Sequence, residues 1–470
     1  MTRRRFLKHA VAAALCVMFV AETFGVIGVT QAAALPYRQF EKGMSYFSFG
    51  STIFLAAGSD RSLRDLAATG TNWVSLIATW YQHSENDSVI APTGSSPTDG
   101  AIIHAIGTIH SLGMKVLLKP QVDTPNGRSH SQINPSNVTG WFASYTAFIL
   151  YYAEIAQRTG VEQLSVGCEL EGTSAYTQAW IDVIRAVRGA YSGALTYAAN
   201  WDEWQHIRFA RSLDYLGVDA YFPLTDKQDP TLAELKTAWQ PYENELEKWS
   251  LENSVPIVFT EIGYWSVPGA AEYPGSGNLA NLCDPSSGQY NATSCKPDQK
   301  LQANLYEAAL ETFWNKPWFR GVFWWTWYPY GRADRRGEGG PNDIHISPHN
   351  KTAEQVLRTW YAKPYVPDGT PTQAVPALLA IQNAENATAH ALRDSRTIGL
   401  DRAEDLLTQA VSAYDSGNYE SARQLAGSAV SAATGAVAIM PASYYAALAL
   451  AVITASAMYL FLKKRTRVRT

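Results

Sequence analysis

The sequence predicts a (β/α)8 TIM barrel, in which eight parallel strands alternate along the chain with helices. Between about residues 42 and 361, eight short apolar runs alternate with helix-length periodic segments, as expected of βα units around a parallel sheet. Eight units in about 320 residues fit the size of this barrel. The alternative is a doubly wound open sheet, which is disfavoured because no glycine-rich phosphate turn follows the first strand.

The expected strands and helices follow one another in the order that a barrel requires. The strands are expected at residues 44–49, 73–78, 116–119, 164–166, 195–198, 215–218, 256–260 and 321–324. The helices are expected at residues 62–68, 98–112, 138–158, 175–188, 231–249, 297–314 and 352–360. Active sites of such barrels form at the C-terminal ends of the strands, so residues at those ends are the candidates for chemistry.

The N-terminal segment, residues 1–35, has the order of a signal peptide. Basic residues at positions 3–8 precede an apolar run at 10–21 and small residues at 32–34. The basic run, RRRFLK, resembles a twin-arginine export signal. The alternative is a retained anchor, although Glu22 interrupts the apolar stretch. The barrel domain is therefore expected at residues 36–362.

The composition changes after the barrel. Four prolines predict a stiff linker over residues 363–376. Residues 377–435 are rich in Ala and Leu with apolar residues at helical spacing, and predict two or three helices, the last two turning at residues 416–418. We expect these helices to form a stalk, with binding of a partner helix as the alternative.

The C-terminal segment has the pattern of a membrane span. Residues 442–462 form a run of 21 residues without a charge. A helix of this length, at about 1.5 Å per residue, is long enough to span a hydrocarbon core of roughly 30 Å. Five basic residues follow in the tail, residues 463–470. The positive-inside rule then places the tail in the cytoplasm and the barrel outside the cell membrane. A buried helical hairpin of a soluble domain is the alternative.

Composition and charge exclude several classes of protein. Aromatic residues make up 12% of the chain and charged residues only 17%, which excludes disorder or coiled coil over most of its length. The net charge is −4, but residues 1–35 carry +3 and residues 463–470 carry +5, which leaves −12 on the part between them. An acidic exported part offers no field for binding nucleic acid.

Cysteine usage agrees with export and argues against a metal enzyme. Cys283 and Cys295 bracket a loop rich in Pro, Ser and Gly and could form a disulfide in an oxidising compartment. Neither a Cys-x-x-Cys pair nor a His-Glu-x-x-His motif is present, so no metal site built by the protein and no cofactor are expected.

Two of the expected strands end in a glutamate, Glu169 after the fourth and Glu261 after the seventh. A carboxylate that closes an apolar strand is costly to bury unpaired, which indicates function. Because these strands face each other across the barrel mouth, the pair could act as the acid/base and nucleophile of a retaining glycosidase. The pKa of Glu169 would then have to be raised by an apolar wall and by the charge of Glu261. A structural ion pair, or Glu171 as the acid, is the alternative.

Several motifs resemble glycoside hydrolase family 113, a β-mannanase family of clan A. They are TGTNWV at residues 69–74, ATWYQ at 78–82, GMKVLLKP at 113–120, GCELEGT at 167–173 and YAANW at 197–201. TEIGY at residues 260–264 resembles the barrel glycosidases of clan A more broadly. The resemblance covers about residues 40–362 and implies retaining hydrolysis, with Glu169 as acid/base and Glu261 as nucleophile. Cys168 stands where many clan members carry Asn, and Gln121 where we expect His. Both departures bear on the identity of the substrate more than on the type of reaction.

Aromatic and polar residues near the strand ends are candidates for binding sugar. Tryptophan rings present apolar faces to a pyranose while the indole N–H bonds hydroxyl groups, although a lone Trp often only packs a core and a Lys–Asp pair often only braces a barrel mouth. The candidate substrate-binding residues are Trp80, Lys119, Asp123, Asn200, Trp201, Asp219, Tyr264, Trp324 and Trp325.

The sequence therefore predicts a membrane-tethered, extracellular, retaining β-glycanase that acts on β-1,4-mannan or a related β-linked glycan. One alternative is a surface glycan-binding protein that has lost catalysis. Another is a structural envelope protein that assembles with a partner through its stalk.

Overall fold

The computed structural model describes residues 36–125, 130–274, 296–330 and 339–438. The predicted signal peptide, the cysteines Cys283 and Cys295, the span at residues 442–462 and the basic tail lie outside the described residues. Within the described residues, no helix is both long enough and apolar enough to cross a membrane.

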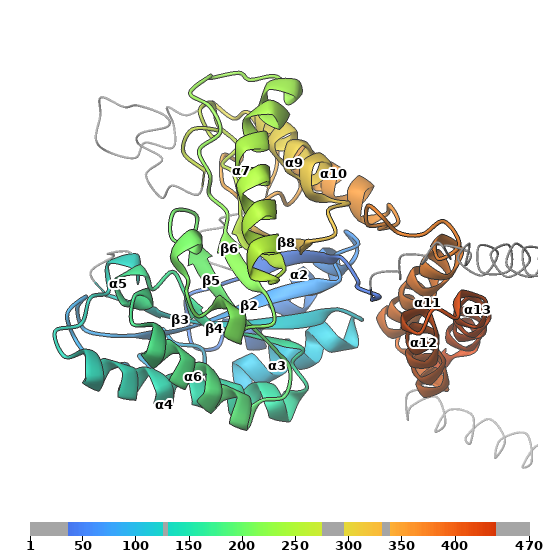
Figure 1. Ribbon diagram of the computed structural model, residues 1–470, viewed down its shortest axis with the longest axis horizontal. Helices are drawn as coiled ribbons and strands as arrows, with labels where there is room; N and C mark the ends of the chain where they lie inside the picture. Colours follow the sequence, from blue (N-terminus) through green and yellow to red (C-terminus); the bar gives the residue numbers. More distant parts are fainter. Residues whose placement is uncertain (1–35, 126–129, 275–295, 331–338, 439–470) are drawn as a thin grey trace, which may run out of the picture.

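Eight parallel strands form a closed barrel in chain order (Figure 1), which confirms the predicted fold class. The register of the closing pair places Glu41 beside Gly321. The strands are β1 (Glu41–Tyr46), β2 (Trp73–Tyr81), β3 (Lys115–Asp123), β4 (Gln163–Cys168), β5 (Ala194–Asn200), β6 (Leu216–Asp219), β7 (Ile257–Ile262) and β8 (Phe319–Trp327). All eight coincide with an expected strand, and β2 and β3 run several residues further toward the mouth.

Helices surround the barrel, and their ends follow from local sequence. The Asn137 side chain accepts a hydrogen bond from the N–H of Gly140 where α4 begins, and left-handed Gly160 ends that helix. Thr231 and Glu234 form a capping box at the start of α7. The helices of the barrel domain are α2 (Ala57–Ala67), α3 (Asp99–Ser111), α4 (Val138–Thr159), α5 (Glu171–Ser174), α6 (Thr177–Ala190), α7 (Leu232–Asn253), α9 (Gln299–Phe313) and α10 (Thr352–Tyr361).

An apolar layer fills the interior of the barrel below the mouth, toward the N-terminal ends of the strands. It shows which residues of each strand point inward. This layer consists of Trp73, Leu117, Tyr215, Val258 and Phe323. Since side chains alternate between the two faces of a strand, residues two or four positions further along also point inward. These residues are Lys119 on β3, Asp219 on β6, Thr260 on β7 and Trp325 on β8. The strand pattern thus places a polar layer directly above the apolar one.

Three further helices form a small bundle after the barrel: α11 (Val375–Arg393), α12 (Leu400–Asp415) and α13 (Tyr419–Gly435), with the short strands β9 (Arg396–Ile398) and β10 (Val437–Ala438). α12 and α13 turn at residues 416–418. Ala410, Ala422 and Ala426 are fully buried between the helices, and such small side chains allow close packing. The domain boundaries and the stalk role stay predictions.

The bundle lies against the N-terminal end of the barrel, away from the strand ends that form the mouth (Figure 1). The Tyr37 hydroxyl and the Gln39 amide donate to Oε2 of Glu385 on α11, at 2.6 and 3.1 Å. Lys115, the first residue of β3, donates to Oε1 of Gln39 at 3.1 Å. A cavity of about 1150 Å³ remains between barrel base and bundle. Its lining comes from the segments that lead into β2, β3 and β4, from α10 and from the bundle, so this cavity is separate from the site at the mouth.

Candidate active site

A buried lysine joins two carboxylates at the barrel mouth. The ammonium of Lys119 lies 3.0 Å from Oδ2 of Asp219 and 2.5 Å from Oε1 of Glu261. The Thr260 hydroxyl donates to Oδ1 of Asp219 at 2.6 Å, and the Tyr221 hydroxyl donates to Oε2 of Glu261 at 2.7 Å. Each carboxylate therefore has both a cationic partner and a hydroxyl donor, which offsets the cost of its burial.

Glu169 follows the last residue of β4 and occupies a turn. Its φ of 48° lies in the left-handed region, and its N–H donates to the carbonyl of Ala198 at 2.7 Å. Oε2 of Glu169 lies 2.6 Å from Nε2 of His130, whose Nδ1 lies 2.9 Å from Oδ1 of Asp123. The His130 and Glu169 side chains are 19% and 13% exposed, so this end of the site can meet a ligand.

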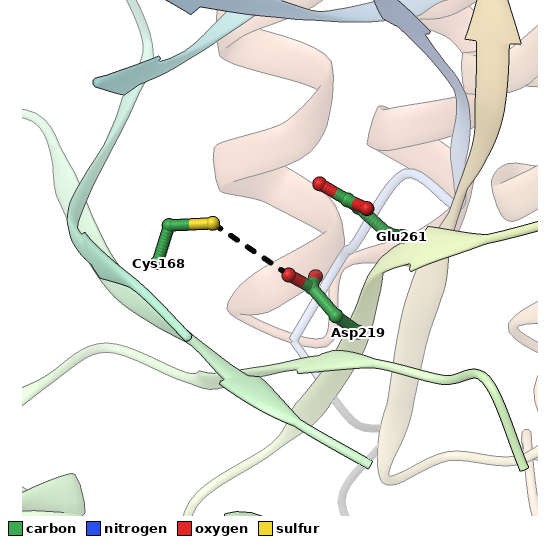
Figure 2. Close-up of side chains that lie close together, drawn as sticks. All are labelled: Cys168, Asp219 and Glu261. Carbon is green, nitrogen blue, oxygen red and sulfur yellow. Dashed lines mark hydrogen bonds between the residues drawn. The ribbon is translucent and has the colours of Figure 1, made fainter. Parts of the chain in front are cut away.

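Cys168 lies beside the lysine-linked carboxylates. Figure 2 shows its side chain directed at Asp219, with Glu261 beside them, and its Sγ lies 3.8 Å from Oδ2 of Asp219. One ligand atom from each of these three residues falls within 4.8 Å of the others, close enough to hold a metal ion. Lys119 already supplies a cation to both carboxylates, and burial raises the pKa of the Cys168 thiol to about 12, which keeps it protonated. We assign no metal to this group.

Burial and neighbouring charges shift the pKa values of the two glutamates in opposite directions. Burial raises the pKa of Glu261, Lys119 opposes this, and the charge of Glu169 adds to it. Burial also acts to raise the pKa of Glu169, but the hydrogen bond and charge of His130, together with the charge of Lys119, outweigh burial and lower it. The expectation of a raised pKa at Glu169 is therefore wrong in the free protein, because the sequence did not reveal His130 beside it.

Three of the nine predicted sugar contacts pack against helices instead. Trp80 lies against Phe148 and Tyr151 of α4, with ring centroids 5.3 and 5.2 Å apart. Trp324 is fully buried and stacks on Tyr306 of α9 at 3.7 Å. Tyr264 is likewise fully buried. Trp80 and Trp324 occupy the outward positions of their strands, one residue out of phase with the polar layer, so their assignment to the mouth is corrected.

The other six predicted contacts lie at the mouth. Lys119, Asp219 and Asp123 belong to the polar network described above. The N–H of Trp201 donates to Oδ1 of Asn200 at 3.0 Å, and the Trp201 ring is partly buried. Trp325, two positions beyond the apolar layer, packs against Phe47 with tilted rings whose centroids are 5.4 Å apart. Trp325 and Trp201 are thus the tryptophans of this set that remain available to a sugar ring.

Sequence reasoning missed His130, Tyr221 and Thr260. Tyr221 and Thr260 could have been found, since Thr260 shares the inward phase of Val258 and Tyr221 lies two residues beyond Asp219. His130 lies in a short 3-10 turn (His130–Gln132) of the loop after β3, where no periodicity indicates its direction.

A (β/α)8 barrel that carries glutamates at the ends of β4 and β7, within one polar network, defines a barrel glycosidase. The sequence model of Glycoside Hydrolase Family 113 matches residues 47–338, and the chain belongs to this family. It is therefore a glycoside hydrolase of the β-mannanase-like kind. A comparison with curated protein sequences finds no match.

Solved structures agree with the family assignment. The GH113 β-mannanase AaManA from Alicyclobacillus acidocaldarius, in complex with ManMIm, is 26% identical with a TM-score of 0.60, over 69% of this chain and 97% of that one. A complex of a GH113 β-1,4-mannanase is 24% identical with a TM-score of 0.60, over 69% of this chain and 99% of that one. At 24% identity, the second structure shows only that the two proteins share a fold.

Proposed function

We propose that this protein is a retaining endo- or exo-acting β-glycanase whose substrate is β-1,4-mannan or a closely related β-linked glycan. The observation that carries the proposal is the arrangement of two glutamates at the barrel mouth. Glu261 of β7 pairs with Lys119, and Glu169, directly after β4, pairs with His130 and hydrogen-bonds with Asp219, the other partner of Lys119. The family and the mannanase named above support mannan as the substrate.

In this proposal, Glu261 is the nucleophile. Lys119 and Tyr221 hold its two carboxylate oxygens, and the ammonium favours the ionised form that attack requires. The carboxylate attacks the anomeric carbon as the glycosidic C–O bond breaks, and Glu169 gives its proton to the leaving oxygen. Glu169 then removes a proton from water, which attacks the anomeric carbon and releases Glu261 and the sugar.

The assignment is tested on the purified protein with a dinitrophenyl β-mannobioside. Glu261→Gln should abolish turnover, since the amide cannot form the glycosyl ester, and full residual activity would refute its role as nucleophile. Glu169→Ala should still release this good leaving group but stall at the glycosyl-enzyme, and added azide should restore turnover as a β-glycosyl azide. Retention on mannan without reducing-end release by the unaltered protein would instead favour a glycan-binding protein.

We also propose that the enzyme is tethered to the outer face of a membrane by residues 442–462. The support is the run of 21 uncharged residues followed by five basic ones. The full chain should sediment with membranes and resist alkaline extraction, while a chain ending at residue 438 should be released. A partner for the helical bundle stays a prediction, to be tested by pull-down with the full chain against a chain lacking residues 377–435.

A further inference from the structure

His130 bridges two carboxylates at the edge of the site. Its Nδ1 lies 2.9 Å from Oδ1 of Asp123, and its Nε2 lies 2.6 Å from Oε2 of Glu169. Both distances are those of hydrogen bonds to carboxylate oxygens. Asp123 is the last residue of β3 and Glu169 follows β4, so the ring fills the space between two adjacent strand ends.

The two contacts fix the protonation state of the ring. An ionised carboxylate only accepts hydrogen bonds, and a neutral imidazole has a single N–H. While both carboxyl groups are ionised, the ring can bond them at once only as the imidazolium, which donates from both nitrogens. The pKa of His130 is accordingly raised well above its usual range: burial acts to lower it, but the hydrogen bonds to Asp123, Cys168 and Glu169 and the charge of Glu169 outweigh burial.

We propose that His130 is a positioning residue for the acid/base. Its imidazolium, held by Asp123, fixes Oε2 of Glu169 and sets the pH above which Glu169 no longer carries the proton that hydrolysis needs. The inference rests on the function proposed above for Glu169.

The direction of the effect follows from the charges around Glu169. The cations that face it are His130 and Lys119; both favour the carboxylate, as does a hydrogen bond with Asp219, while Glu261 is the opposing anion. The groups that face His130 are Asp123 on β3 and Cys168 and Glu169 at the end of β4. A positive neighbour lowers the pKa of Glu169, so the proton that catalysis needs is present only at lower pH. Removal of the His130 charge should therefore extend activity toward higher pH.

The experiment is the pH dependence of kcat/KM, whose alkaline limb reports the acid of the free enzyme. The full chain is assayed on manno-oligosaccharide, whose poor leaving group requires the acid. His130→Gln keeps a neutral donor for Oε2 and removes the charge, and His130→Ala removes both. We expect both variants to move the alkaline limb upward by about one pH unit or more. His130→Ala should also lose more of the maximal kcat, because nothing then holds the carboxyl.

Asp123→Asn gives a second route that leaves His130 intact. Loss of this carboxylate disfavours the imidazolium, and the alkaline limb should again move upward. His104→Gln is the matched control: His104 also pairs with a carboxylate, Asp60 at 2.9 Å, but on the outer helices, and its removal should leave the limb in place.

The outcomes separate the two proposals. If the unaltered enzyme releases no reducing ends from any β-mannoside, the proposed function fails. If it does, and the alkaline limb stays in place in His130→Gln, His130→Ala and Asp123→Asn, only the role of His130 is refuted, and any fall in rate then reflects structure alone.

Discussion

The ammonium of Lys119 lies 2.5 Å from Oε1 of Glu261, and both side chains are buried. At this distance a positive charge stabilises the ionised carboxylate and opposes the effect of burial. Lys119 thereby determines how far the pH can fall before Glu261 is protonated and can no longer attack.

Replacement of Lys119 by Met should raise the pKa of Glu261, and the acid limb of kcat/KM should move upward by about one pH unit or more. Since Asp219 also loses its partner, unfolding should become easier by roughly 3–5 kcal/mol. The pH profile and urea unfolding measure the two effects. Lys351→Met is the matched control, because Lys351 is a buried lysine paired with Asp343 at 3.1 Å, apart from Glu261; an equal shift of the acid limb in that variant would contradict the assignment.

The Tyr221 hydroxyl holds the other oxygen of Glu261 at 2.7 Å. Hydrogen bonds to charged groups contribute about 1.5–3 kcal/mol, so Tyr221→Phe should lower kcat/KM roughly ten- to a hundredfold and shift the acid limb in the same direction as Lys119→Met. Tyr242→Phe loses a comparable bond, to the carbonyl of Pro223 at 2.7 Å, outside the polar network. Similar kinetics in the two variants would show that Tyr221 has no particular role.

The sequence predicts residues that end strands far better than residues that lie in loops. Glu169, Glu261, Lys119 and Asp219 were found because each ends, or nearly ends, an apolar run, and a closed barrel brings all such ends together. Trp324 was misplaced because its neighbour Trp325 is equally close to the strand end. Composition cannot tell which of two adjacent residues points inward until one interior side chain is known.

His130 shows a different limit. Its position beside Glu169 depends on the path of the loop after β3, and that path is set by tertiary contacts instead of by periodicity. The hydrogen bond and charge of His130 are the largest of the effects that lower the pKa of Glu169, so the location of the acid/base could be predicted while its electrostatics could not.

Burial of Glu203 should make stability depend on pH. Burial raises the pKa of this carboxyl from 4.5 to about 7, against hydrogen bonds that oppose the shift. The folded state then binds the proton more tightly than the unfolded state, so this contribution is complete below about pH 4.5 and is lost as the pH rises through about 7. A shift of this size corresponds to roughly 3–4 kcal/mol at most.

Urea unfolding at both ends of that pH window should therefore show a smaller loss of stability for Glu203→Gln than for the unaltered protein. The comparison uses differences between the two pH values, because the amide accepts only one of the two bonds that Tyr197 and the Asn200 N–H donate to the carboxylate. Glu252→Gln, at an exposed position, should behave as the unaltered protein. An unchanged pH dependence in Glu203→Gln would exclude this carboxyl as the source.

The contact between barrel and bundle can be tested with two glycines that share one backbone conformation. Gly113 has φ of +74° and Gly160 has φ of +71°, so alanine at either position should cost about 1–2 kcal/mol of stability. A Cβ on Gly113 would lie 2.7 Å from Cα of Ala389 on α11, whereas one on Gly160 meets nothing within 4 Å.

Gly113→Ala alone should therefore displace the bundle, and limited proteolysis should cleave the segment at residues 363–374 faster than in Gly160→Ala. Hydrolysis of the aryl mannoside should stay equal in the two variants, because the bundle lies at the opposite end of the barrel from Glu169 and Glu261; equal rates of cleavage would show that Ala389 does not pack against Gly113 in solution.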